Sequence, residues 1–163
     1  PAAEKQRTDV REGRTRVGLG VTDLRRSDGP NPGQDEYVQA WAALVDAQQR
    51  GVGRQIGVAN VLPEHLGRIE RETGVRPVVN QIEVHPYFPQ SEQLAYHREH
   101  GILTEAWSPL GRAKELLDED VIREVAVSHG ITPARYATAT ATARATASTA
   151  SGATTATTPC TSR

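Results

Sequence analysis

Three short apolar segments, each followed at once by polar or aromatic residues, do most to limit what this chain can fold into. They read IGVAN (56–60), VVNQIE (78–83) and ILTEAW (102–107). Segments of helical character separate them, so the order is strand, loop, helix, repeated. Strands that alternate with helices of about 10 to 15 residues favour βαβ units and a parallel sheet. In a parallel β/α barrel, active sites lie at the carboxyl ends of the strands.

The helical segments carry start and stop signals. Spacing along one helical face predicts a helix over 34–50, from four residues: Tyr37, Trp41, Leu44 and Val45. Pro63 suits the first turn of the next helix, and Gly74 suits its end. We expect further helices over 92–100 and from Asp118, an acidic N-terminal cap. Three residues of that last helix are expected to face inward: Val121, Ile122 and Val125.

Length, charge and cysteine content restrict the class of protein. A chain of 163 residues suffices for one domain but is shorter than a complete eight-stranded β/α barrel, which takes about 200 to 250 residues. The net charge of −1 gives no reason to expect nucleic acid or an anionic membrane as a partner. No apolar run approaches the roughly 18 residues of a membrane span. The single cysteine, Cys160, fits a reducing compartment, so we expect a cytoplasmic protein.

The two ends differ from the middle, which divides the chain into 1–29, 30–135 and 136–163. The first zone is rich in charge, and its one apolar patch, VGLGV (17–21), is weakened by glycines. We expect this zone to be poorly ordered or to form one marginal strand. The last zone is almost entirely Ala, Thr and Ser, so nothing there is expected to drive burial. It is either a flexible or glycosylated tail or a stretch read out of frame from about Arg135, and a similar frame change would explain the first zone.

The middle zone resembles the aldo-keto reductases, and within them the bacterial 2,5-diketo-D-gluconate reductases. The resemblance covers about residues 30–134 and rests on three sequence motifs: GVAN, NQIEVHPY and EAWSPLG. It implies an α/β fold: a partial (β/α)8 TIM barrel, about strands five to seven with their helices, with disordered or unpatterned ends. It also implies NADPH as the cofactor, a small carbonyl compound, such as 2,5-diketo-D-gluconate, as the substrate, and a monomer.

The resemblance places the nicotinamide at the ends of these strands. Asn60 and Gln81 carry side-chain amides, which both donate and accept hydrogen bonds and therefore suit a planar carboxamide. Both are expected at matching heights on adjacent strands. Trp107 offers a flat face for stacking, at a position where the family commonly has tyrosine. The family usually has serine where this chain has Ala59, so one hydrogen bond, worth roughly 0.5–1.5 kcal/mol, is expected to be lost.

The turn that follows Trp107 resembles the pyrophosphate loop of the family, although SPLG alone would be only a turn. The resemblance assigns three of its residues to cofactor binding: Ser108, Leu110 and Gly111. We interpret His85 as a loop-packing residue rather than a catalytic one, and Glu83 as a buried structural partner. The other histidines have no carboxylate or thiol at metal-ligand spacing, so we expect no metal site.

The catalytic residues of the family have no counterpart in this sequence. The family uses a tyrosine, a lysine, an aspartate and a histidine, and the histidine position reads RRSDGP (25–30) here. The site for the cofactor's 2′-phosphate should follow the helix that Pro133 opens, where the Ala/Thr zone stands. We therefore expect no turnover, and two unpaired sheet edges that favour aggregation. A non-catalytic nicotinamide-binding module and an interaction protein that uses its tail remain alternatives.

Overall fold

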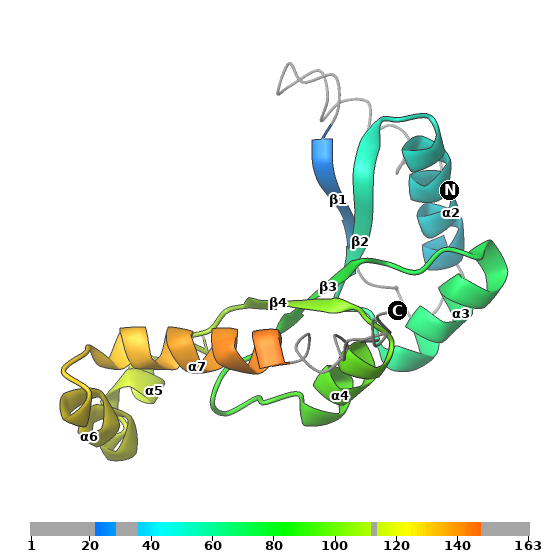
Figure 1. The fold of residues 1–163 in the computed structure, drawn as a ribbon. Helices are drawn as coiled ribbons and strands as arrows, with labels where there is room; N and C mark the ends of the chain where they lie inside the picture. Colours follow the sequence, from blue (N-terminus) through cyan, green and yellow to red (C-terminus); the bar gives the residue numbers. More distant parts are fainter. Residues whose placement is uncertain (1–21, 29–35, 112–113, 148–163) are drawn as a thin grey trace, which may run out of the picture.

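The computed structural model describes residues 22–28, 36–111 and 114–147, and these form four strands and six helices. Helices and strands alternate along the first part of the chain, and three helices follow the last strand (Figure 1). The elements are β1 (Thr22–Asp28), α2 (Glu36–Gln49), β2 (Gly53–Ala59), α3 (Pro63–Thr73), β3 (Val79–Glu83), α4 (Ser91–Glu99), β4 (Leu103–Trp107), α5 (Lys114–Asp118), α6 (Asp120–Ser128) and α7 (Pro133–Ala147).

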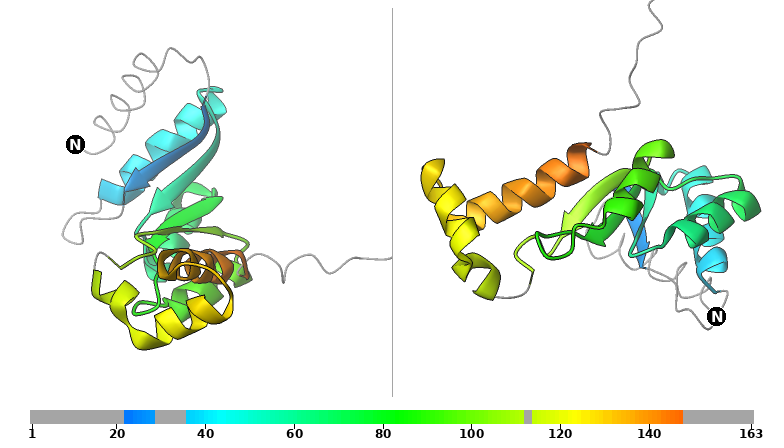
Figure 2. Two further views of the ribbon diagram at one scale, coloured as in Figure 1. Left: turned by 90° about the vertical axis from the view of Figure 1, so that its left-hand side faces the viewer. Right: turned by 90° about the horizontal axis from the view of Figure 1, so that it is seen from below.

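The four strands make one parallel sheet in the order β1-β2-β3-β4. Each strand is joined to its neighbour by a helical crossover, and α2, α3 and α4 lie along the same side of the sheet (Figures 1 and 2). A parallel sheet whose spatial order equals its chain order is one sector of a β/α barrel. The predicted partial barrel is therefore confirmed.

The sheet has one strand more than the sequence predicted. β1 lies in the zone that we expected to be poorly ordered, and it pairs with β2 from Thr22 opposite Gly53 to Asp28 opposite Ala59. The apolar patch proposed as a marginal strand (17–21) lies outside the described residues. The prediction relied on short apolar segments, and β1 (TDLRRSD) has only one apolar residue, Leu24; its parallel ladder is made by backbone groups and does not require such a segment. This is why β1 was missed.

The main core lies between the sheet and helices α2 and α3. Trp41 and Leu44 of α2 pack with Ile56 of β2 and with Leu66 and Ile69 of α3, and all five side chains are almost completely buried. The indole N–H of Trp41 donates to the carbonyl of Val75 at 3.0 Å, so this aromatic residue is both packed and hydrogen-bonded. The predicted inward face of α2 is confirmed.

Helix α3 begins and ends where the sequence predicted. Pro63 occupies the first turn, where its missing N–H costs no hydrogen bond. Gly74 ends the helix with φ of 71° and donates its N–H to the carbonyl of Glu70 at 2.8 Å. An L-residue with a side chain rarely adopts this left-handed conformation, which explains the glycine.

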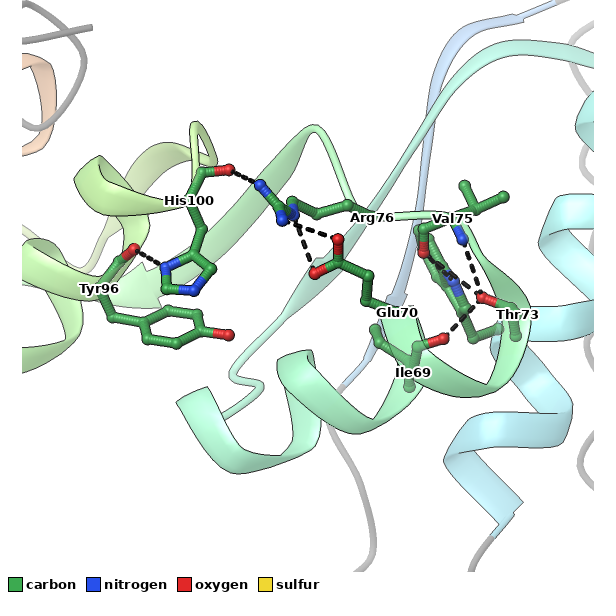
Figure 3. Close-up of polar contacts among 8 residues, drawn as sticks. Ile69, Glu70, Thr73, Val75, Arg76, Tyr96 and His100 are labelled. Carbon is green, nitrogen blue, oxygen red and sulfur yellow. Dashed lines mark hydrogen bonds and ion pairs between the residues drawn. The ribbon is translucent and has the colours of Figure 1, made fainter.

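Arg76 joins the loop before β3 to the loop before β4, at the amino end of the sheet (Figure 3). Arg76, which precedes β3, binds both carboxylate oxygens of Glu70 at 3.0 and 2.7 Å and also donates to the carbonyl of His100. The His100 ring stacks on Tyr96 with centroids 3.9 Å apart. In β/α barrels this end of the sheet serves stability rather than chemistry.

A buried polar network connects β3 with α4. Asn80 is fully buried; its amide nitrogen donates to the Val61 carbonyl at 2.7 Å and lies 3.1 Å from Nε2 of His97. Gln93 donates to the same carbonyl at 2.8 Å. Because the amide nitrogen is a donor, Nε2 accepts, and Nδ1 of His97 carries the proton that is donated to Thr104 Oγ1 at 2.8 Å. The network thus holds His97 neutral.

The helix expected from Asp118 is α6, which begins at Asp120, and it is preceded by a short helix, α5, that was not predicted. Asp118 ends α5, and Glu119 is the N-terminal cap of α6. Ile122 is buried as predicted, whereas Val121 is 62% exposed, so the prediction for Val121 was wrong. Leu116 of α5 is completely buried instead and packs with Ile122. The buried face of α6 consists of Ile122 and Ala126, four residues apart, and Val121 lies outside it.

The Ala/Thr segment forms most of α7, so part of the zone expected to lack burial is packed. Helix α7 begins at Pro133, as predicted, and lies alongside β4 (Figure 1). Its inward face consists of alanines four residues apart: Ala137, Ala141 and Ala145 are each at most 4% exposed. Alanine is the best helix former, and its small side chain permits close packing. In the ranges that the structure describes, no helix is long and apolar enough to cross a membrane.

Candidate functional site

The predicted cofactor residues come together at the carboxyl end of the sheet. Gln81 lies opposite Ala59 on one side and Glu105 on the other, and Glu83 lies opposite Trp107. Asn60 follows β2 directly, and its N–H donates to the Gln81 carbonyl at 2.8 Å. Asn60 and Gln81 were expected at matching heights, but the register places Gln81 beside Ala59, one residue earlier. The offset separates the two amides along the strand direction.

Trp107 and Asn60 are joined by a hydrogen bond across the end of β3. The indole Nε1–H donates to Asn60 Oδ1 at 2.9 Å, although β2 and β4 are not neighbours in the sheet. Asn60 is exposed, and Trp107 is half-buried. The bond fixes the plane of the indole and leaves the amide nitrogen of Asn60 pointing away from it, as a donor for a further partner.

Gln81 is held by a residue that the sequence analysis did not single out. Its Nε2 donates to Oε1 of Glu105 at 2.9 Å. Strand alternation brings Glu105 to the same face of the sheet as Trp107, two residues later, and this spacing could have identified it. Because the bond engages the amide nitrogen, it orients the Gln81 carbonyl oxygen as an acceptor on the opposite side.

Two residues at this end of the sheet have a strained backbone. Asn60 and Ser108 follow β2 and β4 directly and have φ of 55° and 51°. Asparagine tolerates this left-handed region, whereas serine adopts it less readily. Such conformations cost on the order of 1 kcal/mol and cluster at functional sites. Their position on both sides of Gln81 supports this end of the sheet as the site.

The Ser108–Gly111 segment is a closed turn. The N–H of Gly111 donates to the Ser108 carbonyl at 2.8 Å, and Gly111 has φ of 65°. Leu110 lies between them and packs against the cluster around Leu116 and Ile122. The three residues proposed for cofactor binding are therefore contiguous with Trp107 and anchored on the helices that follow β4.

His85 lies in the loop after β3, as its interpreted packing role requires. Its ring is in edge contact with Tyr87, and its Nε2 lies 3.8 Å from Oε1 of Glu83. Both side chains are largely buried, which agrees with a structural pairing rather than with exposed catalytic groups. Among the described residues, no group of three His, Cys, Asp or Glu side chains could hold a metal ion.

The arrangement suits a flat ring that bears a carboxamide. Asn60 offers a donor, Gln81 an acceptor, and Trp107 an aromatic surface whose orientation the hydrogen bond to Asn60 fixes. A primary carboxamide has one acceptor oxygen and one donor nitrogen, so the two amides complement it. Together these three residues can hydrogen-bond the carboxamide and stack on the ring.

Comparison with known proteins identifies the family to which this site belongs. A sequence model of the Aldo/keto reductase family matches residues 2–157. The chain belongs to the aldo/keto reductase family. The match is wider than the range 30–134 in which we recognised the resemblance, and it takes in β1 and α7.

Relatives of this aldo/keto reductase include two bacterial enzymes. The chain is 47% identical over 124 residues to 2,5-diketo-D-gluconic acid reductase B of Corynebacterium sp. (strain SHS752001), covering 76% of this chain and 45% of the relative. It is 42% identical over 121 residues to methylglyoxal reductase DkgA of Escherichia coli (strain K12), covering 74% and 44%. The chain therefore spans about half the length of the curated relatives it matches.

A solved structure has a similar arrangement of elements. A mutant of Gox0644, solved in complex with NADPH, matches with a TM-score of 0.76 and 41% identity, over 80% of this chain and 48% of the other. The four-stranded sector described above thus corresponds to about half of that protein.

Proposed function

We propose that this chain supplies the nicotinamide-binding face of an NADPH-dependent carbonyl reductase. The observation that carries the proposal is the hydrogen bond between Trp107 and Asn60, which fixes an aromatic plane beside two oriented amides. Family membership supports the choice of cofactor, since the Gox0644 mutant was solved with NADPH.

In this proposal each residue has a separate binding role. The Trp107 face stacks on the nicotinamide ring, Asn60 donates to the carboxamide oxygen, and Gln81 accepts from the carboxamide nitrogen. Backbone groups of the Ser108–Gly111 turn, including Leu110, bind the pyrophosphate. Bound NADPH would supply the hydride. The residues of this chain hold and orient the ring, and Glu105 maintains the orientation of Gln81.

We further propose that the chain does not reduce carbonyls by itself. Proton donation by a tyrosine requires a lowered pKa and a fixed position beside the carbonyl. The side chains proposed to hold the nicotinamide are two amides and an indole, and Glu105 is bound to Gln81. The parent reductase would act on a small carbonyl compound such as a keto-sugar acid or methylglyoxal, which the names of its relatives contain. It would be a cytoplasmic monomer.

Binding and turnover can be measured on the same preparation. We expect isothermal titration calorimetry to show saturable NADPH binding by the full chain. We expect no loss of NADPH absorbance when 2,5-diketo-D-gluconate or methylglyoxal is added. Carbonyl-dependent NADPH consumption would contradict the proposed lack of turnover, and a folded chain that binds no NADPH would contradict the proposed site.

A further inference from the structure

The His85 ring lies directly against Gly111, the last residue of the turn that follows β4. A Cβ atom added at Gly111 would be 3.1 Å from Nδ1 of His85, 3.3 Å from Cε1 and 3.4 Å from Cγ. Contacts of 3.0–3.4 Å are tighter than nine in ten real Cβ contacts, so a side chain at Gly111 would force the His85 ring to move by a few tenths of an ångström. The loop after β3 and the turn after β4 are thus packed closely at a position that glycine suits.

Gly111 is constrained twice, and the two constraints can be separated. Its φ of 65° disfavours any residue with a side chain, as at Gly101, where φ is 66°. At Gly101, however, an added Cβ would meet nothing within 4 Å. The contact with His85 is therefore specific to Gly111, and Gly101 is a matched reference for the backbone strain alone.

Three contacts hold the His85 ring in this position. The backbone of His85 exchanges two hydrogen bonds with Phe88, of 3.3 and 2.9 Å, which closes the loop on itself. Glu83 lies beside Nε2, and Tyr87 contacts the ring edge. The opposite nitrogen, Nδ1, is buried without a hydrogen-bond partner. A buried polar atom left unpaired is unfavourable, so the position of the ring is imposed by packing rather than by a bond from Nδ1.

We propose that His85 is a positioning residue that sets the Ser108–Gly111 turn and thereby the affinity of this turn for a pyrophosphate. The ring packs against Gly111 and fixes the turn, whose Gly111 N–H donates to the Ser108 carbonyl. The backbone N–H groups of Ser108 and Leu110 are then oriented to bind a diphosphate anion. His85 does not touch the ligand. This inference rests on the proposed function and extends it to the diphosphate half of the cofactor.

Two ligands allow the contribution of the turn to binding to be measured apart from that of the nicotinamide face. NADPH contains a pyrophosphate, whereas reduced nicotinamide mononucleotide contains the same ring but no pyrophosphate. Calorimetric titration of His85→Ala should show NADPH affinity lowered by about tenfold, the effect of one charge-assisted hydrogen bond. Affinity for the mononucleotide should stay within about twofold of the wild-type value, because the contact between Trp107 and Asn60 is untouched.

Substitution of Gly111 tests the same contact with the His85 ring by changing the second partner. Gly111→Ala should lower NADPH affinity more than His85→Ala does, because it adds backbone strain to the collision with the ring. Adding His85→Ala to Gly111→Ala should restore part of the lost affinity. Gly101→Ala, with equal strain and no contact, should leave NADPH affinity unchanged. Circular dichroism checks that each variant is folded. If His85→Ala does not fold, the comparison of Gly111→Ala with Gly101→Ala tests the contact.

The outcomes distinguish this inference from the proposed function. Equal losses for NADPH and the mononucleotide in His85→Ala, or a double variant that binds no better than Gly111→Ala, would overturn the positioning role. A folded wild-type chain that binds neither ligand would overturn the proposed function itself, and the positioning role with it.

Discussion

Trp107 and Asn60 are 47 residues apart in sequence and are joined by a hydrogen bond of 2.9 Å from the indole nitrogen to the amide oxygen. The bond passes over the end of β3 and connects two strands that are not neighbours. It turns separate strand ends into one surface with a defined aromatic plane. The proposed nicotinamide site depends on this bond more than on any other contact.

Removing the Asn60 side chain should weaken nicotinamide binding without straining the backbone. Asn60→Gly keeps the φ of 55° and deletes the amide. We expect affinity for reduced nicotinamide mononucleotide to fall by about 3- to 10-fold in calorimetry, which corresponds to one or two modest hydrogen bonds. Gln90→Gly is the matched control, since Gln90 has φ of 51° at the start of α4. Wild-type affinity in Asn60→Gly would show that the amide does not bind the ligand.

His97 should make the fold sensitive to mild acid. Burial, helped by nearby His100, lowers the pKa of His97 from 6.5 to about 4. Because the folded pKa lies below the unfolded one, the stabilisation is complete above pH 6.5 and is lost as pH falls towards 4. Linkage gives a loss on the order of 3 kcal/mol across this window. Urea unfolding at a series of pH values measures it.

The His97 contribution can be isolated by substitution. In His97→Gln the free energy of unfolding should vary less between pH 6.5 and 4 than in the wild type, even if the variant is less stable throughout. His129→Gln, at an exposed histidine, should keep the wild-type slope. An unchanged slope in His97→Gln would mean that other groups cause the acid sensitivity.

The alanine face of α7 should be sensitive to charge. Ala141 is 1% exposed and packs with Ile82, Val84 and Leu94. We expect Ala141→Asp to lower the free energy of unfolding by about 2–4 kcal/mol, because a carboxylate would be buried without a partner. Ala139→Asp places the same residue on the exposed face and should cost less than about 1 kcal/mol. Equal effects of the two substitutions in urea unfolding would contradict the packing of α7.

The ion pair between Arg76 and Glu70 should contribute modestly to the free energy of unfolding. The hydrogen bonds from Arg76 lower the pKa of Glu70, so the contribution is present above the unfolded pKa of 4.5 and disappears as pH falls below it. The side chains are 39% and 34% exposed, so solvent screening limits the coupling to about 1 kcal/mol or less. A double-mutant cycle with Arg76→Gln and Glu70→Gln measures it at pH 7 and in acid. Coupling that persists in acid would contradict this assignment.

Periodicity predicted the middle of the fold well, because its strands and helices bury one face. The inward face of α2, the ends of α3 at Pro63 and Gly74, and the last strand up to Trp107 all follow from local pattern. β1 could not be found in this way, since its sequence, TDLRRSD, contains no apolar run, although its backbone pairs with β2. The start of helix α7 at Pro133 was predicted, but its packing was missed because alanine alone was not expected to bury a face.

The partners of the site residues were less predictable than the residues themselves. Asn60, Gln81 and Trp107 were recognised from their motifs, but the contacts of Trp107 with Asn60 and of Gln81 with Glu105 depend on register. The network of Asn80 and His97 spans β3 and α4, and nothing in the spacing of single residues indicates it. Contacts between distant segments require the packed arrangement to be known.

The nicotinamide face can be tested most directly by tryptophan fluorescence. The chain has two tryptophans; Trp41 is 1% exposed in the core, and Trp107 is at the site. We expect NADPH to quench wild-type emission to saturation. In Trp107→Tyr, which keeps an aromatic face, calorimetry should still detect NADPH binding while the saturable quenching disappears. A folded wild-type chain without saturable quenching, or quenching that survives in Trp107→Tyr, would contradict the account.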